Sequence, residues 1–226
     1  MKVGLFGGTF NPIHHCHLSV ARQVRDRLAL DRIVFIPSSD PPHKPTGDLA
    51  PARHRVEMVR RAIAAEPSFT VSEIETGRPG KSYSIDTVCE LLEEYGPALY
   101  FILGLDAFRE LPDWREPAEL LRLCHFVVVS RPGSSFLIVG SMPLLPALDR
   151  DALKALDSGG AERLDVPLSG GRTLILLPLP PCDASASDIR KRLRRRLDVS
   201  RELPASVQSY IIQFGLYQEE SDHTRV

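Results

Sequence analysis

Short apolar runs alternate with segments of helical spacing along most of the chain. Six apolar runs are each followed by turn residues, and we predict buried strands at 3–6, 33–36, 69–71, 99–103, 126–129 and 174–177. Helices are predicted between them, where apolar residues recur every three or four positions, over 18–28, 52–65, 85–95 and 118–123. This alternation indicates an α/β fold with a mostly parallel sheet and helices on both faces, in which ligands bind at the carboxyl ends of the strands.

The alternation is interrupted between residues 133 and 171, where Gly, Ser and Pro are frequent. We expect an irregular excursion there, with a weak helix around 151–156. Two more helices are predicted after the last strand, one opened by Ser185-Ala186-Ser187-Asp188 and one over 204–215. The residues expected to face inward from these two helices are Ile189, Leu193, Leu197, Val207, Ile211 and Phe214. We therefore predict one domain over 1–217, followed by a frayed polar tail over 218–226.

The composition is that of an ordinary globular chain. The 226 residues are 43% hydrophobic and 25% charged, which is enough for one core. The net charge of -1 gives no general attraction to nucleic acid or to an anionic membrane, so any anion site is local. No apolar stretch approaches the roughly 18 to 20 residues of a membrane span, and the N-terminus runs directly into a strand. The expected location is cytoplasmic.

The four cysteines, at positions 16, 89, 124 and 182, are widely spaced and form no C-x-x-C pair. This spacing is typical neither of a zinc knuckle nor of a thioredoxin-like site. We expect four reduced thiols, with Cys89 and Cys124 in the core.

The segment from Gly7 to Leu18 directly follows the first predicted strand and has the features of a phosphate site. Two glycines allow positive φ and a sharp turn that presents backbone N–H groups to an anion. Asn11 and Pro12 then favour a helix start. His14 and His17 are three residues apart, so both imidazoles share one face of the first turn. Two imidazoles above an anion nest favour phosphoryl or nucleotidyl transfer, in which spread negative charge must be stabilised.

A zinc site is the first alternative for this segment, because His14, His15, Cys16 and His17 are all good ligands. Four consecutive positions cannot close a tetrahedron, so at most two of them could ligate, with others such as His43 completing the site. A second alternative is a metal- or redox-sensing nucleotide-binding protein that has lost turnover.

Further candidates lie after the other strands. Two prolines stiffen the loop that projects Lys44, which is otherwise a solvent-exposed lysine. Gly104-Leu105-Asp106 ends a strongly apolar strand, where the carboxylate can accept from ribose hydroxyls or cap the next helix. Trp114, the single tryptophan, is ordinarily a core anchor. The basic run 190–196 is typical of a segment that binds nucleic acid. Ser187 and Arg190, however, occupy a first helical turn, which favours a small anion. We therefore assign 192–196 to the surface.

The segment Gly7-Gly8-Thr9-Phe10-Asn11-Pro12-Ile13-His14-His15-Cys16-His17 resembles the T/H-x-G-H signature of the nucleotidyltransferase superfamily. The likeness is specifically to bacterial nicotinate-nucleotide adenylyltransferases, because further motifs of that family follow in order. They are Pro41-Pro42-His43-Lys44, Ser82-Tyr83-Ser84-Ile85-Asp86-Thr87, Gly104-Leu105-Asp106, Trp114, Ser130-Arg131-Pro132-Gly133 and Ser185-Ala186-Ser187-Asp188-Ile189-Arg190. The resemblance implies a Rossmann-like, doubly wound fold.

The resemblance also implies a reaction, in which ATP adenylylates nicotinate mononucleotide to give nicotinate adenine dinucleotide and pyrophosphate, in NAD biosynthesis. The attack is in line, with no covalent enzyme intermediate. Magnesium is expected to enter with ATP through phosphate oxygens and water, without a metal site of the protein. A related enzyme that adenylylates nicotinamide mononucleotide or phosphopantetheine shares the signature, but Ser82-Tyr83-Ser84 and Trp114 argue against it.

The roles that the resemblance implies fall into three sets. The residues expected to stabilise charge during the reaction are His14, His17, Lys44 and Arg190. The residues expected to bind ATP are Gly8, Thr9, Phe10, Cys16, Gly104, Asp106, Ser187 and Arg190. The residues expected to bind the mononucleotide are Ser39, Lys44, Ser84, Trp114 and Arg131. In this scheme the indole of Trp114 stacks on the pyridine ring, whose carboxylate meets backbone N–H groups near Trp114 and the Ser84 hydroxyl.

Two positions depart from the family pattern. Cys16 stands where the signature has glycine, a position close to the adenosine of ATP in the family. We expect the small thiol to fit after a slight backbone shift. Ala186 stands where the family often has serine, which removes one possible hydroxyl contact to phosphate.

Overall fold

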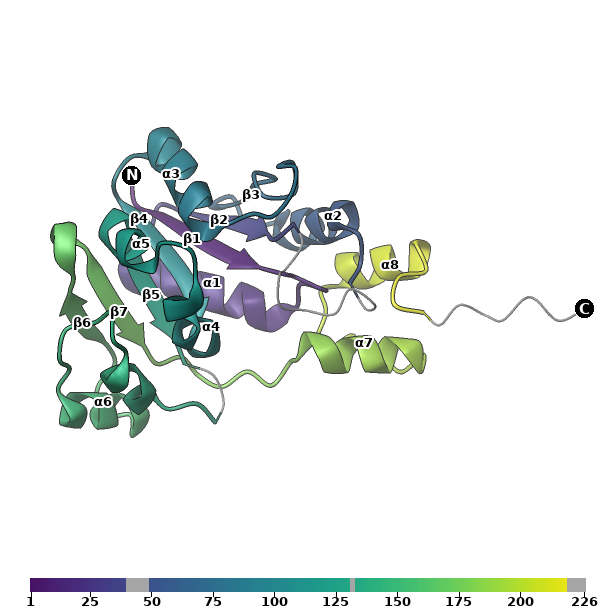
Figure 1. Cartoon of the computed structure of the whole chain (residues 1–226). Helices are drawn as coiled ribbons and strands as arrows, with labels where there is room; N and C mark the ends of the chain where they lie inside the picture. The colour runs from purple at the N-terminus through teal and green to yellow at the C-terminus, as the bar shows by residue number, and fades with distance from the viewer. Residues whose placement is uncertain (40–48, 131–132, 219–226) are drawn as a thin grey trace, which may run out of the picture.

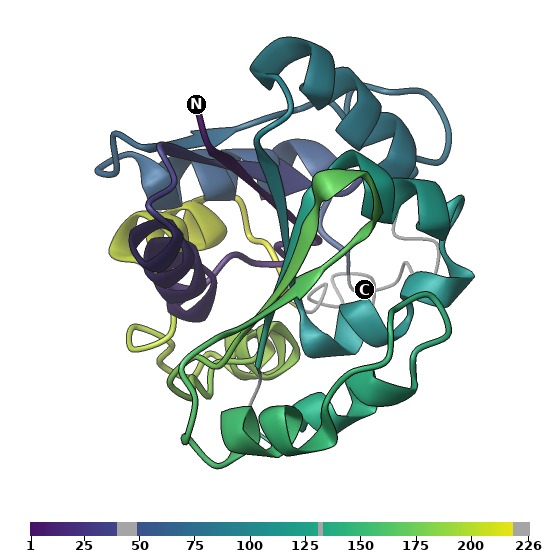
Figure 2. The same cartoon turned by 90° about the vertical axis from the view of Figure 1, so that its left-hand side faces the viewer.

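A twisted seven-stranded sheet runs through the middle of the computed structural model, which describes residues 1–39, 49–130 and 133–218 (Figures 1 and 2). The strands lie in the order β3-β2-β1-β4-β5-β7-β6. Their bounds are β1 Val3–Gly8, β2 Arg32–Pro37, β3 Phe69–Val71, β4 Leu99–Gly104, β5 His125–Val129, β6 Leu164–Pro167 and β7 Thr173–Leu177. All neighbouring pairs are parallel except β6 and β7, so the Rossmann-like, mostly parallel sheet is confirmed.

The central strands are apolar on both faces because helices cover both sides of the sheet. In β1, Leu5 packs in one core layer and the next residue, Phe6, packs in the opposite layer. Gly4, directly before Leu5, leaves room for neighbouring side chains, since a Cβ there would lie 2.6 Å from Ile33 Cδ1 and 2.8 Å from Ile102 Cδ1. The short apolar runs of the sequence therefore match the strands closely.

The helices form two layers, on opposite sides of the sheet in Figure 2. One layer, which shares a core with Phe6 and Phe35, contains α1 His15–Leu28, α2 Ala52–Ile63, α7 Ala186–Arg194 and α8 Ala205–Gln213. The other layer, which shares a core with Leu5 and Phe101, contains α3 Ser84–Tyr95, α4 Leu105–Arg109, α5 Pro117–Leu123 and α6 Arg150–Asp157. The chain leaves β1 toward the first layer and leaves adjacent β4 toward the second. The carboxyl ends of these two strands are therefore the switch point at which sheets of this type have a ligand-binding crevice.

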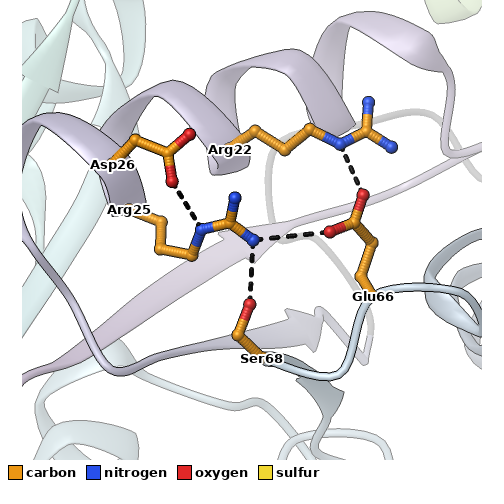
Figure 3. A network of polar contacts seen from close by, with 5 residues as sticks. All are labelled: Arg22, Arg25, Asp26, Glu66 and Ser68. Carbon is orange, nitrogen blue, oxygen red and sulfur yellow. Dashed lines mark hydrogen bonds and ion pairs between the residues drawn. The ribbon is translucent and has the colours of Figure 1, made fainter.

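A surface network fixes α1 to the segment between α2 and β3 (Figure 3). Arg22 Nε lies 2.6 Å from Glu66 Oε1, and Arg25 Nη1 donates to Ser68 Oγ at 2.9 Å. Arg25 Nε also donates to Asp26 Oδ1 at 2.7 Å, and this contact raises the pKa of the guanidinium. Each exposed pair is worth about 1 kcal/mol or less, so the network orients α1 more than it stabilises the fold.

The region 133–171 is more regular than the sequence predicts. It contains the 3-10 segment η3 Phe136–Ser141, helix α6, strand β6 and the 3-10 segment η4 Ser169–Gly171. The weak helix expected around 151–156 is confirmed as α6. Strand β6 escaped the hydrophobic pattern because it is a four-residue edge strand in which only Val166 is buried.

Two residues expected to face inward do not. Leu197 lies beyond the end of α7 and is 52% exposed, and Phe214 follows α8 and is 49% exposed. Arg192, assigned to the surface, has a side chain that is 39% exposed, contacts Glu202 Oε1 at 2.5 Å and donates to the carbonyl of Asp198. The turn after α7 is therefore held by polar contacts at the surface.

The prediction of four reduced thiols is wrong for two of them, because Cys16 and Cys182 form a disulfide. Cys89 is exposed on α3 and not in the core. Cys124 is buried as expected, and burial raises the pKa of its thiol to about 12. Within the described ranges, no helix has both the length and the apolar character needed to cross a membrane.

Candidate functional site

The turn between β1 and α1 differs from the glycine nest that the sequence suggests. Gly7 and Gly8 are part of strand β1, and the positive φ of the turn is taken by Phe10, at 46°. Gly8 is needed for a different reason, because a Cβ there would lie 3.0 Å from Cζ of the Phe10 ring. The left-handed backbone of a bulky residue is strained, and burial of the Phe10 ring against Phe6, Phe35 and His17 offsets that strain.

His14 and His17 share one face, as predicted. Helix α1 begins at His15, so His14 is its N-cap, while Asn11 and Pro12 lie in the preceding turn and do not start the helix. The two imidazole centroids are 3.8 Å apart. The backbone N–H of His14 donates to His17 Nδ1 at 3.3 Å, so the proton of the neutral His17 ring sits on Nε2. His17 therefore presents an N–H donor at the N-terminus of α1, where an anion is also favoured by the helix dipole.

Helix α7 lies beside this turn although it is far away in the sequence. Arg190 Nη1 donates to the carbonyl of Asn11 at 2.8 Å, across 179 positions. Arg190 Nε is buried and has no hydrogen-bond partner in the part of the chain that is described. Ser187, in the first turn of α7, pairs its hydroxyl with that of the N-cap Ser185 at 2.7 Å. Figure 1 shows α7 and α8 beyond the carboxyl end of β1, and the hydrogen bond from Arg190 places α7 beside the turn that leads into α1.

Asn11 connects three segments of the chain. Its Oδ1 accepts from the backbone N–H of Ala50 at 3.1 Å and from the hydroxyl of Tyr217 at 2.7 Å. Burial raises the pKa of Tyr217 well above its usual range. Sequence reasoning missed Tyr217, because it lies 206 positions from Asn11 and directly before the predicted tail.

Arg55 is a second residue that sequence reasoning missed. It lies on α2, has no exposed surface, and donates to the carbonyl oxygens of Thr9, Ser39 and Ala50. One guanidinium therefore joins the chain after β1, the chain after β2 and the entry to α2. The only sequence signal was an arginine on the apolar side of a predicted helix, beside Val56 and Val59.

The other wall of the crevice follows β4. Gly104 is the N-cap of α4, and Asp106 lies exposed in its first turn, so Asp106 is not the cap itself. Trp114 is half-buried and packs edge-on against Phe101, with ring centroids 6.1 Å apart. Ser84 is the first residue of α3 and shares this side of the sheet. Trp114 therefore packs against the core, as expected of an anchor, while part of the residue stays exposed to solvent.

Three predicted residues lie outside the described residues: His43, Lys44 and Arg131. Ser39 is the last residue described before the first gap. The zinc alternative loses one ligand, because the sulfur of Cys16 is bonded to Cys182. Across 1–39, 49–130 and 133–218, no group of three or more His, Cys, Asp or Glu residues is placed to hold a metal ion. The polar groups that the structure places around the turn after β1 include the imidazoles of His14 and His17, the Arg190 guanidinium and the N-terminus of α1.

Known proteins are similar to this chain over nearly its whole length. The family described as cytidylyltransferase-like matches residues 5–192. A protein of Pelobacter propionicus named "Probable nicotinate-nucleotide adenylyltransferase" is 42% identical over 97% of this chain and 99% of its own length. One of the same name from Moorella thermoacetica is 37% identical over 98% of this chain and 94% of its own.

A solved structure gives an independent comparison of the fold. The nicotinic acid mononucleotide adenylyltransferase of Plasmodium falciparum, complexed with NaAD, superimposes with a TM-score of 0.70 over 96% of this chain and 97% of that one. The sequence identity is 19%, so this likeness is evidence for the fold alone.

Proposed function

This chain belongs to the nicotinate-nucleotide adenylyltransferase family, and we propose that it transfers the adenylyl group of ATP to nicotinate mononucleotide. The products are nicotinate adenine dinucleotide and pyrophosphate, in NAD biosynthesis. The observation that supports this most directly is the imidazole pair of His14 and His17, which follows the turn whose Asn11 carbonyl accepts a hydrogen bond from Arg190. Two imidazoles, a guanidinium and two helix N-termini suit the charge of a polyphosphate.

The reaction needs little beyond positioning and charge stabilisation. A phosphate oxygen of the mononucleotide attacks the α-phosphorus of ATP, a new P–O bond forms, and the bond to the β-phosphate bridging oxygen breaks as pyrophosphate leaves. The nucleophile is already an anion, so no general base and no covalent enzyme intermediate is required. We assign His17 Nε2–H, His14, Arg190 and Lys44 to the negative charge that spreads over the α-phosphate and the leaving group.

Magnesium is proposed to enter as part of the ATP substrate. Asp106 is a single exposed carboxylate, and the described part of the chain has no acidic cluster beside it. Magnesium that keeps most of its water and binds phosphate oxygens does not need such a cluster. The nucleotide itself is assigned to Gly8, Thr9, Phe10, Cys16, Gly104, Asp106, Ser187 and Arg190.

The mononucleotide is proposed to lie on the opposite wall of the crevice, with its pyridine ring on Trp114. The N-terminus of α3, with Ser84 as its first residue, offers N–H and O–H donors to a carboxylate. An anion gains more from several such donors than a neutral amide does, which favours nicotinate over nicotinamide. Ser39, Lys44 and Arg131 are proposed to complete this subsite. The single domain over 1–217 and the cytoplasmic location stay predictions of the sequence.

A pyrophosphate-release assay with ATP and magnesium tests the reaction and its substrate together. Nicotinate mononucleotide, nicotinamide mononucleotide and phosphopantetheine are supplied in turn to the full chain. We expect kcat/KM for the nicotinate compound to exceed that for the nicotinamide compound by about tenfold or more, since one charge-assisted hydrogen bond is worth about 1.5–3 kcal/mol. Equal values for the two mononucleotides would contradict the carboxylate subsite, and turnover with phosphopantetheine alone would replace the proposed acceptor.

A further inference from the structure

A disulfide bond crosses the candidate site. Cys16 is the second residue of α1, one position before His17, and Cys182 lies between β7 and α7. Their Cα atoms are 5.7 Å apart, although 166 positions separate them in the sequence. The bond therefore joins the helix that carries the imidazole pair to the segment that leads into the helix of Arg190.

We propose that Cys16 and Cys182 form a reversible thiol–disulfide couple, a modification site that controls how tightly the enzyme binds ATP. The consequence for ATP rests on the function proposed above, whereas formation and reduction of the bond do not depend on it.

The two sulfur atoms have different surroundings, which determines which sulfur is attacked by a thiolate and which one leaves. Cys182 is exposed, so a small thiolate can reach its sulfur. Cys16 is 7% exposed and lies in the first turn of α1, where backbone N–H groups and the helix dipole stabilise a thiolate. A stabilised thiolate is a good leaving group and favours the reduced state, so this bond is expected to open more readily than a structural disulfide.

Reduction takes two exchange steps. A small thiolate attacks the sulfur of Cys182, the bond to Cys16 breaks, and Cys16 leaves as a thiolate. A second small thiolate attacks the outer sulfur of the mixed disulfide and releases Cys182. The protein disulfide gains two electrons and becomes two thiols, while two small thiols are oxidised to one small disulfide. The same steps in reverse, with a small disulfide as the oxidant, close the bond again.

The bridge limits how far α7 can move relative to α1. Arg190 Nη1 donates one hydrogen to the carbonyl of Asn11, and the guanidinium has further N–H groups for a phosphate. A polyphosphate that contacts both His17 and Arg190 requires a particular spacing of α1 and α7. The Cys16–Cys182 bond restrains any adjustment of that spacing, because it ties the approach of α7 to α1 itself. The oxidised enzyme is therefore expected to bind ATP more weakly than the reduced enzyme.

The two other cysteines provide the internal comparison. Cys124 is buried and out of reach of a small disulfide. Cys89 is exposed on α3, but partial desolvation of its thiol and four nearby acidic side chains raise the pKa of that thiol, which lowers its thiolate fraction. Cys89 is also on the opposite side of the sheet from α1, so Cys89→Ser is a matched control.

The test uses the full chain, treated either with dithiothreitol or with oxidised glutathione that is then removed. Alkylation under denaturing conditions and intact mass count the thiols, and calorimetric titration with ATP and magnesium measures Kd. We expect four alkylated thiols after reduction and two after oxidation, with Kd for ATP about tenfold higher in the oxidised protein. Cys182→Ser should keep the Kd of the reduced wild type under both treatments, and Cys89→Ser should respond as the wild type does.

Four alkylated thiols after oxidation would overturn the couple, and an unchanged Kd with the bond formed would overturn its control of ATP. A bond that forms but resists dithiothreitol in the folded protein would overturn its reversibility. If the reduced protein binds ATP but releases no pyrophosphate with nicotinate mononucleotide, the proposed function has failed while the thiol counts and Kd values still decide the redox proposal.

Discussion

Arg55 Nη1 donates a hydrogen bond to the carbonyl oxygen of Thr9 at 2.8 Å, from a side chain with no exposed surface. Its Nε reaches the carbonyl of Ala50 at 2.9 Å, and its Nη2 reaches that of Ser39 at 2.7 Å. Thr9 and Ser39 follow adjacent parallel strands, so the arginine sets the distance between two loops at the mouth of the crevice. A flat guanidinium with its donors in a fixed fork suits this role, and an ammonium group does not.

Replacement of Arg55 by lysine should therefore lower both stability and turnover. A single ammonium cannot satisfy three divergent carbonyls, and each buried carbonyl left without a partner costs about 1–3 kcal/mol. We expect the free energy of unfolding to fall by about 2–4 kcal/mol in urea titrations, and kcat to fall with it. Arg60→Lys is the matched control, because Arg60 is on the same helix, 51% exposed and ion-paired with Glu57. Equal losses in the two variants would show that Arg55 does not act through the loops.

His17 gives the most direct test of the catalytic proposal. His17→Ala removes the Nε2–H donor from the first turn of α1, and we expect kcat to fall by about 100- to 1,000-fold, as for loss of one preorganised donor. The fold should persist, because the His17 ring is only partly buried. His15→Ala, an exposed imidazole two positions earlier, controls for the change of residue type. Steady-state assays of the reduced proteins decide the matter, and a His17→Ala enzyme within a few-fold of wild type would remove His17 from the mechanism.

The regular part of the fold could be predicted from the sequence because buried strands are short, continuous apolar runs. The runs at 3–6 and 99–103 are apolar on both faces of the sheet and stand out without any tertiary information. The edge strand β6 has no such apolar run, since only Val166 is buried. The imidazole pair was also predictable, because a separation of three residues at a helix start fixes a shared face.

The contacts that organise the site could not be predicted in the same way. Arg55 and Thr9 are 46 positions apart, and Cys16 and Cys182 are 166 apart, so no local pattern relates them. The turn after β1 differs from its prediction for another reason. Glycine has two uses, positive φ and room for a neighbour, and the sequence does not say which applies. Here Phe10 takes the positive φ and Gly8 makes room for its ring.

A substitution at Trp114 tests whether its indole belongs to the mononucleotide subsite and not to the ATP subsite. If its ring stacks on the pyridine of the mononucleotide, Trp114→Ala should raise KM for nicotinate mononucleotide by about tenfold, which corresponds to about 1.4 kcal/mol, and leave KM for ATP nearly unchanged. Trp114→Phe keeps a ring and should restore most of the affinity. Melting temperatures measured beside the kinetics account for the lost packing against Phe101. An equal rise in both KM values would place the indole in the core and not in the subsite.

The carboxyl of Glu75 is expected to make the stability of the folded protein depend on pH. Burial raises the pKa of its carboxyl, against the opposing hydrogen bond from Thr87 and the charge of Arg78. Between the ordinary pKa of 4.5 and the raised pKa of the folded state, the folded protein holds a proton that the unfolded chain has lost. The free energy of unfolding therefore falls as the pH rises through this range. Glu75→Gln keeps an acceptor for Thr87 and should be more stable than wild type at pH 8, with the advantage lost below pH 4.5. Urea titrations across this range, with the exposed Glu73→Gln as control, measure it. A Glu75→Gln protein less stable than wild type at pH 8 would show that Thr87 and Arg78 outweigh the burial of the charge.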